Sequence, residues 1–310
     1  MKKTLFSFLA IASIMSMAIV SCKKENTNSG SDSSAEVSVQ SDDQSRVSEE
    51  TDAVTNDAVS SIESSPAMAG GRVSDVLGLI CDATITLDSV SATKKVTITY
   101  NGSNCQGNRT RTGAVVVLLP TAKAWKDPGA AVTITYTNVK ITRNSDAKSI
   151  TLNGTHTVTN VSGGLLWNLP NLQSITHTIT SSDMSITFDD GSKRTWQVAR
   201  QRVFTYNNGI VITQTGTKTD GTTTGIETWG TTRFGGAFTN QITQPLVVRQ
   251  DCSFRLVSGS YKHTSPLATA TIIFGLDKNG VATGCPGTGT YYYKATWTVL
   301  GKDYTFIFPY

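Results

Sequence analysis

Apolar and polar residues alternate along most of the chain after position 80, with the period of two that β-strands with one buried face require. The clearest case is 131–142, where valine, isoleucine and tyrosine alternate with threonine. No helical period interrupts this pattern. Strands are predicted at 83–87, 96–100, 114–119, 131–142, 149–161, 172–181, 184–188, 194–206, 210–219, 223–229, 238–249, 253–262, 269–276, 281–283, 291–300 and 304–308.

Short turns such as Asn101-Gly102, Asp189-Asp190-Gly191 and Asp220-Gly221 join these strands. Because turns of two to five residues connect antiparallel neighbours, the sequence predicts an all-β domain over 67–310. We expect a large antiparallel up-and-down meander of about 15 strands. A sheet of this size must bury one face, so it should curl into a sandwich, a clam or an open barrel.

One segment before the strands has a helical period instead. Its apolar residues and one threonine recur at spacings of three and four, at Val47, Thr51, Val54, Ala58 and Ile62. We predict a short, acidic, amphipathic N-terminal helix within 41–66, with Ser41 as its N-cap. The alternative is a wholly disordered acidic stalk, because the apolar stripe is thin.

The chain begins with Met1-Lys2-Lys3 and an apolar run that ends at Ile19-Val20-Ser21-Cys22. This combination resembles the signal peptide and lipobox of bacterial lipoproteins that signal peptidase II cleaves. The resemblance implies that 1–21 is a signal peptide and that Cys22 carries acyl chains such as palmitate, which anchor the protein to a membrane. A transmembrane helix is the alternative, but the run is slightly shorter than the ~20 residues that it needs.

The residues after Cys22 extend this resemblance. Lys23-Lys24-Glu25 followed by a Ser/Asn/Gly tract is similar to uncharacterised lipoproteins of Bacteroidota, as is Asn-Arg-Thr-Arg-Thr-Gly at 108–113. The resemblance implies a lipid anchor in the outer membrane of the cell envelope, on its periplasmic face or at the cell surface, and it carries no activity. The polar composition of 22–40 predicts a flexible tether behind the lipidated cysteine.

Charge is unevenly distributed, although the net charge is only +4. Ten acidic residues and one arginine lie in 25–66, whereas lysine and arginine predominate in 67–310. This asymmetry indicates either that the acidic helix docks on the basic domain or that the domain binds an anionic ligand. Nucleic acid is not an expected partner, because the basic residues are dispersed and no nucleic-acid-binding signature is present.

Five cysteines are present. If Cys22 is lipidated, the other four form two disulfides in an oxidising compartment. We favour Cys81–Cys105 and Cys252–Cys285 among the three connectivities, because each pair closes a local hairpin. No Cys-x-x-Cys or Cys/His cluster indicates a metal site, and no cofactor motif is present.

Two motifs could bind small ligands. His156 and His177 lie in similar Thr-His-Thr sequences, and a symmetric hairpin would make them cross-strand neighbours, half of a metal site. Two neutral, half-buried imidazoles are the more ordinary interpretation. The strand 194–206 places arginines and aromatic residues on one face, which suits an anionic or glycan ligand, the acidic helix or simple solvation: Arg194, Trp196, Arg200, Arg202, Phe204 and Tyr206.

These observations leave three functions open. The first is a non-enzymatic binding or scaffolding domain, since no catalytic motif is recognisable. The second is a carrier of lipid or hydrophobic cargo in an open barrel, which requires a deep apolar concavity. The third is a glycan hydrolase with two carboxylates from Asp189, Asp190, Glu227 or Asp251. The loop 163–172 is unusually apolar and is expected to pack internally rather than to form an exposed patch.

Overall fold

The computed structural model describes residues 31–70, 80–90, 93–120, 122–266, 268–285, 289–299 and 301–310. The predicted signal peptide 1–21 and the predicted lipid-bearing Cys22 lie outside the described residues. Among the described residues, no helix is long and apolar enough to cross a bilayer.

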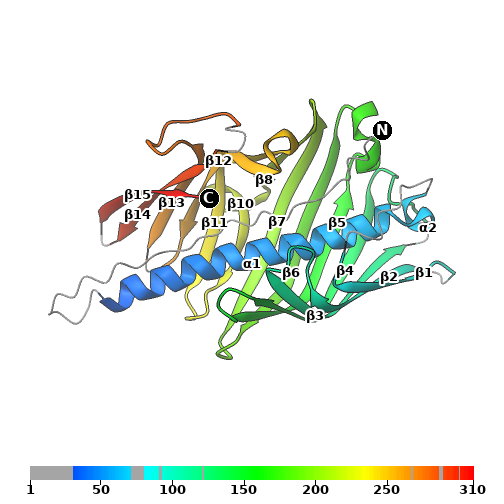
Figure 1. Cartoon of the computed structure of the whole chain (residues 1–310), viewed down its shortest axis with the longest axis horizontal. Helices are drawn as coiled ribbons and strands as arrows, with labels where there is room; N and C mark the ends of the chain where they lie inside the picture. The colour runs from blue at the N-terminus through cyan, green and yellow to red at the C-terminus, as the bar shows by residue number, and fades with distance from the viewer. Residues whose placement is uncertain are drawn as a thin grey trace.

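Fifteen antiparallel strands form one continuous, strongly curved sheet, which confirms the predicted all-β meander (Figure 1). The order across the sheet is β1 to β7 and then β10 to β15. The strands are β1 (Ala83–Asp88), β2 (Thr93–Ser103), β3 (Arg109–Pro120), β4 (Ala130–Arg143), β5 (Ser149–Asn160), β6 (Ile175–Phe188), β7 (Lys193–Tyr206), β8 (Ile210–Gly216), β9 (Lys218–Asp220), β10 (Thr223–Thr231), β11 (Ala237–Arg249), β12 (Arg255–Thr264), β13 (Thr269–Leu276), β14 (Tyr292–Val299) and β15 (Lys302–Pro309).

The sheet departs from a simple meander between β7 and β11. β8 pairs with the C-terminal halves of these two strands, whereas β10 pairs with their other halves. β8 and β10 therefore lie end to end in a single strand position between β7 and β11, and β9 forms a hairpin with β10. This arrangement divides the predicted strand 210–219 into β8 and β9. The predicted strand 281–283 is wrong, because only an isolated bridge forms there, at Ala282.

Bulges bend the long strands. The β3–β4 register shifts around Gly113, which has φ +99°, and the β5–β6 register shifts around Gly154, which has φ +122°. A Cβ atom on Gly113 would lie 2.2 Å from the carbonyl oxygen of Asn138. Glycine is required there both by its backbone conformation and by the close approach of the neighbouring strand, and the bend turns the sheet into a trough.

Helix α1 (Ser31–Glu63) lies in this trough and crosses the strands, beginning beside the C-terminal strands and ending near β1 and β2 (Figure 1). The predicted apolar stripe is confirmed, since Val47, Val54, Ala58 and Ile62 are fully buried. The predicted start is wrong: α1 passes through Ser41 and includes part of the segment 22–40 that we assigned to a flexible tether.

The helix ends where the sequence predicts. Its last residue, Glu63, precedes Ser65, whose hydroxyl accepts a hydrogen bond from the Met68 backbone N–H and so caps the short helix α2 (Pro66–Ala69). Pro66 stands in the first turn of α2 and Gly70 ends it in the left-handed conformation. Met68 is fully buried, so α2 closes the β1–β4 end of the trough.

Ion pairs attach α1 to the sheet, which confirms the predicted docking of the acidic helix. Carboxylates of the helix meet arginines of β3, β4 and β7 and one arginine of the β10–β11 turn. The N–O distances are 2.5–2.9 Å for Arg109–Glu49, Arg109–Glu50, Arg111–Asp57, Arg143–Asp42, Arg202–Asp52 and Arg233–Asp43. Arg200 also contacts Asp52. The polar residues beside the thin apolar stripe of α1 therefore bind the sheet through ion pairs.

Both predicted disulfides are present. Cys81–Cys105 spans the β1–β2 hairpin, and Cys252–Cys285 spans the β12–β13 hairpin. Cys252 lies in a short 3-10 helix, η3 (Gln250–Cys252), that follows β11. Each bridge closes a local loop, and on a chain-entropy estimate each stabilises the fold by about 3–4 kcal/mol.

Candidate functional site

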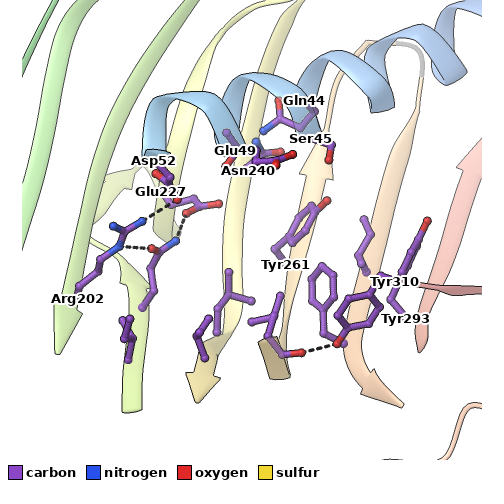
Figure 2. A pocket seen from close by; sticks show the side chains of 18 of the residues that line it. Gln44, Ser45, Glu49, Asp52, Arg202, Glu227, Asn240, Tyr261, Tyr293 and Tyr310 are labelled. Carbon is purple, nitrogen blue, oxygen red and sulfur yellow. Dashed lines mark hydrogen bonds and ion pairs between the residues drawn. The ribbon is translucent and has the colours of Figure 1, made fainter. Parts of the chain in front are cut away.

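A cavity of about 350 Å³ lies between α1 and the second half of the sheet. Over β1–β7 the apolar stripe of α1 packs against the sheet in one large core cluster. Over β7–β15 the helix presents polar residues to the sheet instead, among them Gln44, Ser45 and Asp52, and here the trough is not filled (Figure 2). The volume is in the range of sites that hold small ligands, ~300–1,000 Å³.

The wall of the cavity formed by the sheet is mainly apolar and aromatic. Tyr261, Tyr293 and Tyr310 lie along it in Figure 2, and Phe274 packs among them with ring-centroid distances of 5.7–6.0 Å. Leu246, Ile272 and Trp297 also line this wall. The cavity therefore has a polar roof, formed by the helix, and an apolar floor, formed by the sheet.

A polar network lies at the β7 side of the cavity. Arg202 donates from Nη2 to Asp52 at 2.7 Å and from Nε to Gln214 at 2.8 Å, and the Gln214 amide donates to Glu227 at 2.9 Å (Figure 2). Arg200, just beneath, shares Asp52 with Arg202. Strand β8 supplies Gln214 and β10 supplies Glu227, so the network depends on these two strands sharing one position in the sheet.

The pKa values of the two carboxylates in this network shift in opposite directions. Burial raises the pKa of Glu227 above its ordinary value, and the nearby Arg200 only partly opposes this. Burial also raises the pKa of Asp52, but the ion pairs with Arg200 and Arg202 outweigh burial and leave that pKa below its usual range. Asp52 is thus held ionised, whereas Glu227 takes up a proton more readily than an ordinary glutamate does.

Two polar atoms in the cavity wall lack a hydrogen-bond partner among the described residues. They are the Tyr293 hydroxyl and Nε2 of His177, and these side chains are 7% and 3% exposed. Buried polar groups are normally hydrogen-bonded. Both atoms are also inaccessible to solvent, so they are unsatisfied within the wall and do not face the cavity space.

The predicted His156–His177 pair is wrong. Strand β6 pairs His177 with Asn160, while His156 lies opposite Ile134 on β4. His156 contacts Tyr136 and Thr55, and His177 packs edge-on against Trp125 and Phe204. Burial lowers the pKa of both imidazoles to about 3, so both are neutral at ordinary pH.

The arginine-rich face of β7 points into the trough and meets the acidic helix, which is one of the three possibilities that the sequence left open. Its residues occupy different environments. Arg202 and Phe204 line the cavity. Arg194, Trp196 and Arg200 are buried beneath α1, and the Arg194 guanidinium lies 4.5 Å from the Phe238 ring centroid and donates to Gln44. The sixth residue of the predicted ligand set, Tyr206, is 47% exposed at the end of the strand.

The carboxylates proposed for glycan hydrolysis are not brought together. Asp190 lies in an exposed turn and contacts Arg233, and Asp251 contacts Arg249. Of the candidates, Glu227 alone lines the cavity. Among the described residues, one group has the spacing of metal ligands, Asp251 with Cys252 and Cys285, but both sulfur atoms belong to a disulfide.

The apolar loop 163–172 packs internally, as predicted. It contains a 3-10 helix, η2 (Leu166–Asn171), in which Leu169 is fully buried against Phe204 and Ile210. Leu166 lines the cavity, while Trp167 is 48% exposed. The loop thus closes the β5–β7 end of the cavity.

Glu63, at the end of α1, fixes this loop. Its carboxylate accepts hydrogen bonds from the Trp125 indole N–H at 3.3 Å and from the Leu166 backbone N–H at 3.0 Å. Burial raises the pKa of Glu63 to about 7, although both hydrogen bonds oppose the shift. No arginine or lysine within the described ranges forms an ion pair with it.

We expect Glu63 to make stability depend on pH. The folded state holds a proton on Glu63 up to about pH 7, whereas the unfolded chain releases it near pH 4.5. Stability therefore falls as pH rises through this window, by roughly 3 kcal/mol from this group. Urea unfolding of the wild type and of Glu63→Gln from pH 4.5 to 8 measures the difference. A difference that is independent of pH would contradict the assignment.

Sequence reasoning found Arg202 and Phe204 but missed most of the cavity. The alternation along β12–β14 places Tyr261, Phe274 and Tyr293 on one face, but nothing in the sequence indicates that this face lies opposite a polar stretch of helix. Asp52 was noted only for its charge and Gln214 not at all. No protein-family model matches the chain, and no match was found among curated proteins or solved structures.

Proposed function

We propose that the protein is a lipid-anchored envelope protein that binds a hydrophobic molecule in the cavity between α1 and β7–β15. The observation that carries this proposal is the apolar, aromatic wall of a cavity of about 350 Å³ beneath a polar helix. Apolar cavities of this kind bind apolar ligands, because transfer of apolar surface from water is favourable by about 25 cal/mol per Å². Among the functions that the sequence left open, carriage of hydrophobic cargo is the one that needs such a concavity.

The proposed membrane anchor supports the same role. Acyl chains on Cys22 would hold the domain close to a bilayer, which is a source of hydrophobic ligands. Labelling of growing cells with an alkyne-bearing fatty acid should mark the wild-type protein and should not mark Cys22→Ala. Labelling that survives this substitution would refute lipidation at Cys22.

Filling part of the cavity should weaken ligand binding. Ala270 lines the cavity, and its neighbour Thr271 does not, because successive residues of β13 point to opposite faces. We expect Ala270→Phe to lower the affinity for a neutral apolar fluorescent probe at least tenfold. Thr271→Phe is the matched control and should bind as the wild type does.

The melting temperatures of both variants distinguish a filled cavity from a damaged fold. In a closely packed core an inserted ring costs about 1–3 kcal/mol, but an open cavity accepts it at smaller cost. Unchanged probe binding by Ala270→Phe, or failure of the delipidated wild type to bind any apolar probe, would refute the proposed function.

A further inference from the structure

The ratio of carboxylates to arginines in the ion pairs of the trough is reversed at the cavity. Arg109, Arg111, Arg143 and Arg233 each contact two carboxylates. At Asp52, by contrast, two arginines share one carboxylate. Among the described residues, the ion-pair group with an excess of positive charge thus lines the cavity, through Asp52 and Arg202.

Arg202 has hydrogen-bonding capacity left over. A guanidinium group has five N–H donors. Two of them have acceptors within 3 Å, Asp52 Oδ2 and Gln214 Oε1, and the contact from Nη1 to Asn56 is 3.5 Å long. Arg202 is the member of the arginine pair that lines the cavity, so its remaining donors can reach a ligand there.

Glu227 is the one further carboxylate in this network, and it contacts Arg202 only through Gln214. The groups that face it are Asp52 from α1, Arg200 and Arg202 from β7, Gln214 from β8 and Tyr261 from β12. With Glu227 ionised, the charges of this network cancel. With Glu227 protonated, the network has one uncompensated positive charge in a buried site, which an anion would stabilise.

The cavity extends away from this network along the sheet. From β7 to β13 the strand order passes β10, β11 and β12, and four strand spacings amount to roughly 19 Å. The lining changes over that distance from the Arg202 network to Tyr261, Phe274 and Tyr293. This shape fits one extended hydrocarbon chain with a polar group at the β7 end.

We propose that the ligand is a single-chain amphiphile with an anionic headgroup, such as a long-chain carboxylate, which binds Arg202 while Glu227 takes up one proton from solvent. This inference rests on the proposed function and names the ligand class of the same cavity. A cationic headgroup would meet the two arginines. A neutral headgroup would bind without proton uptake, because ionised Glu227 already balances the charge of this network.

The test compares hexadecanoate with hexadecanol on the delipidated wild-type protein, by displacement of a neutral apolar probe from pH 6 to 9. We expect the affinity for hexadecanoate to fall by up to about tenfold per pH unit above the point where free Glu227 ionises, because one proton is bound with each ligand. The affinity for hexadecanol should not change with pH. Calorimetry in buffers of different ionisation enthalpy should count the same proton directly on the wild type.

Two variants assign the effect to residues. Glu227→Gln keeps a hydrogen-bonding partner for Gln214 and should bind hexadecanoate with no proton uptake and with higher affinity at pH 8. Arg202→Gln should lower the affinity for hexadecanoate at least tenfold and leave that for hexadecanol unchanged. Equal, pH-independent binding of the acid and the alcohol would overturn this inference and leave the proposed function intact, whereas failure of both to displace the probe would count against both.

Discussion

Replacing Arg111 with leucine is expected to lower the free energy of unfolding by about 3–5 kcal/mol, because it leaves buried carboxylates without a counter-charge. Arg111 donates to both oxygens of Asp82 and to Asp57, each at 2.7 Å, and its guanidinium lies 4.2 Å from the ring centroid of Tyr100. The Asp82 side chain is fully buried. Urea unfolding at pH 7, followed by tryptophan fluorescence, measures the loss.

Arg143→Leu is the matched control. Arg143 also contacts two carboxylates, Asp42 and Asp146, but its side chain is 33% exposed, whereas that of Arg111 is 7% exposed. Exposed ion pairs contribute only about 0–1 kcal/mol, since water already solvates both partners. In addition, Asp82→Asn should recover part of the stability that Arg111→Leu loses. Equal losses at Arg111 and Arg143 would show that burial does not determine the effect.

Removing residues 31–65 is expected to abolish cooperative unfolding. The deletion uncovers the core that Val47, Val54 and Ile62 fill, and it strips the concave face of the carboxylates that pair with its arginines. Together these losses exceed the 5–15 kcal/mol by which a typical domain is stable. Thermal unfolding followed by near-ultraviolet circular dichroism tests this directly.

Supplying the missing helix separately provides the control. A peptide of residues 31–65 should restore a sharp transition to the truncated protein. A second peptide, with amides in place of the ion-pairing carboxylates, should not: Asp42, Asp43, Glu49, Glu50, Asp52 and Asp57. A truncated protein that melts sharply within a few degrees of the full chain would show that α1 is an accessory to the sheet.

The sequence predicted the elements that depend on local pattern. Alternation in 131–142 and glycine-containing turns such as Asp220-Gly221 define strands and their antiparallel order, and local spacing was enough to pair Cys81 with Cys105. The start of α1 was missed because Ser41 and Asp42 have the composition of an N-cap although they lie inside the helix. Polar side chains of α1 that resemble a helix cap or a solvated face in the sequence, such as Asp42, instead pair with arginines of the sheet.

The register of the strands and the presence of the cavity could not be predicted, because they depend on contacts between distant parts of the chain. His156 and His177 would be neighbours across a symmetric hairpin. The loop between β5 and β6 contains η2, however, and the two strands pair in a different register, so that Asn160 lies opposite His177. The cavity depends on bends such as the one at Gly275, where the β13–β14 register shifts, and on which stretch of α1 lies over β12–β14. Neither leaves a local signal in the sequence.

The position of α1 inside the trough also governs how the chain folds. Gln40 hydrogen-bonds to His263, which is 223 residues away, and Asp43 pairs with Arg233, which is 190 residues away. An isolated helix this polar is marginal in water, because helical stability in proteins comes mainly from packing. Its partners exist only once the strands from β3 to β12 are in register, so the segment synthesised before the sheet is among the last to acquire fixed structure. We therefore expect slow folding, during which the nascent chain exposes both the acidic segment and the arginine-lined face until they meet.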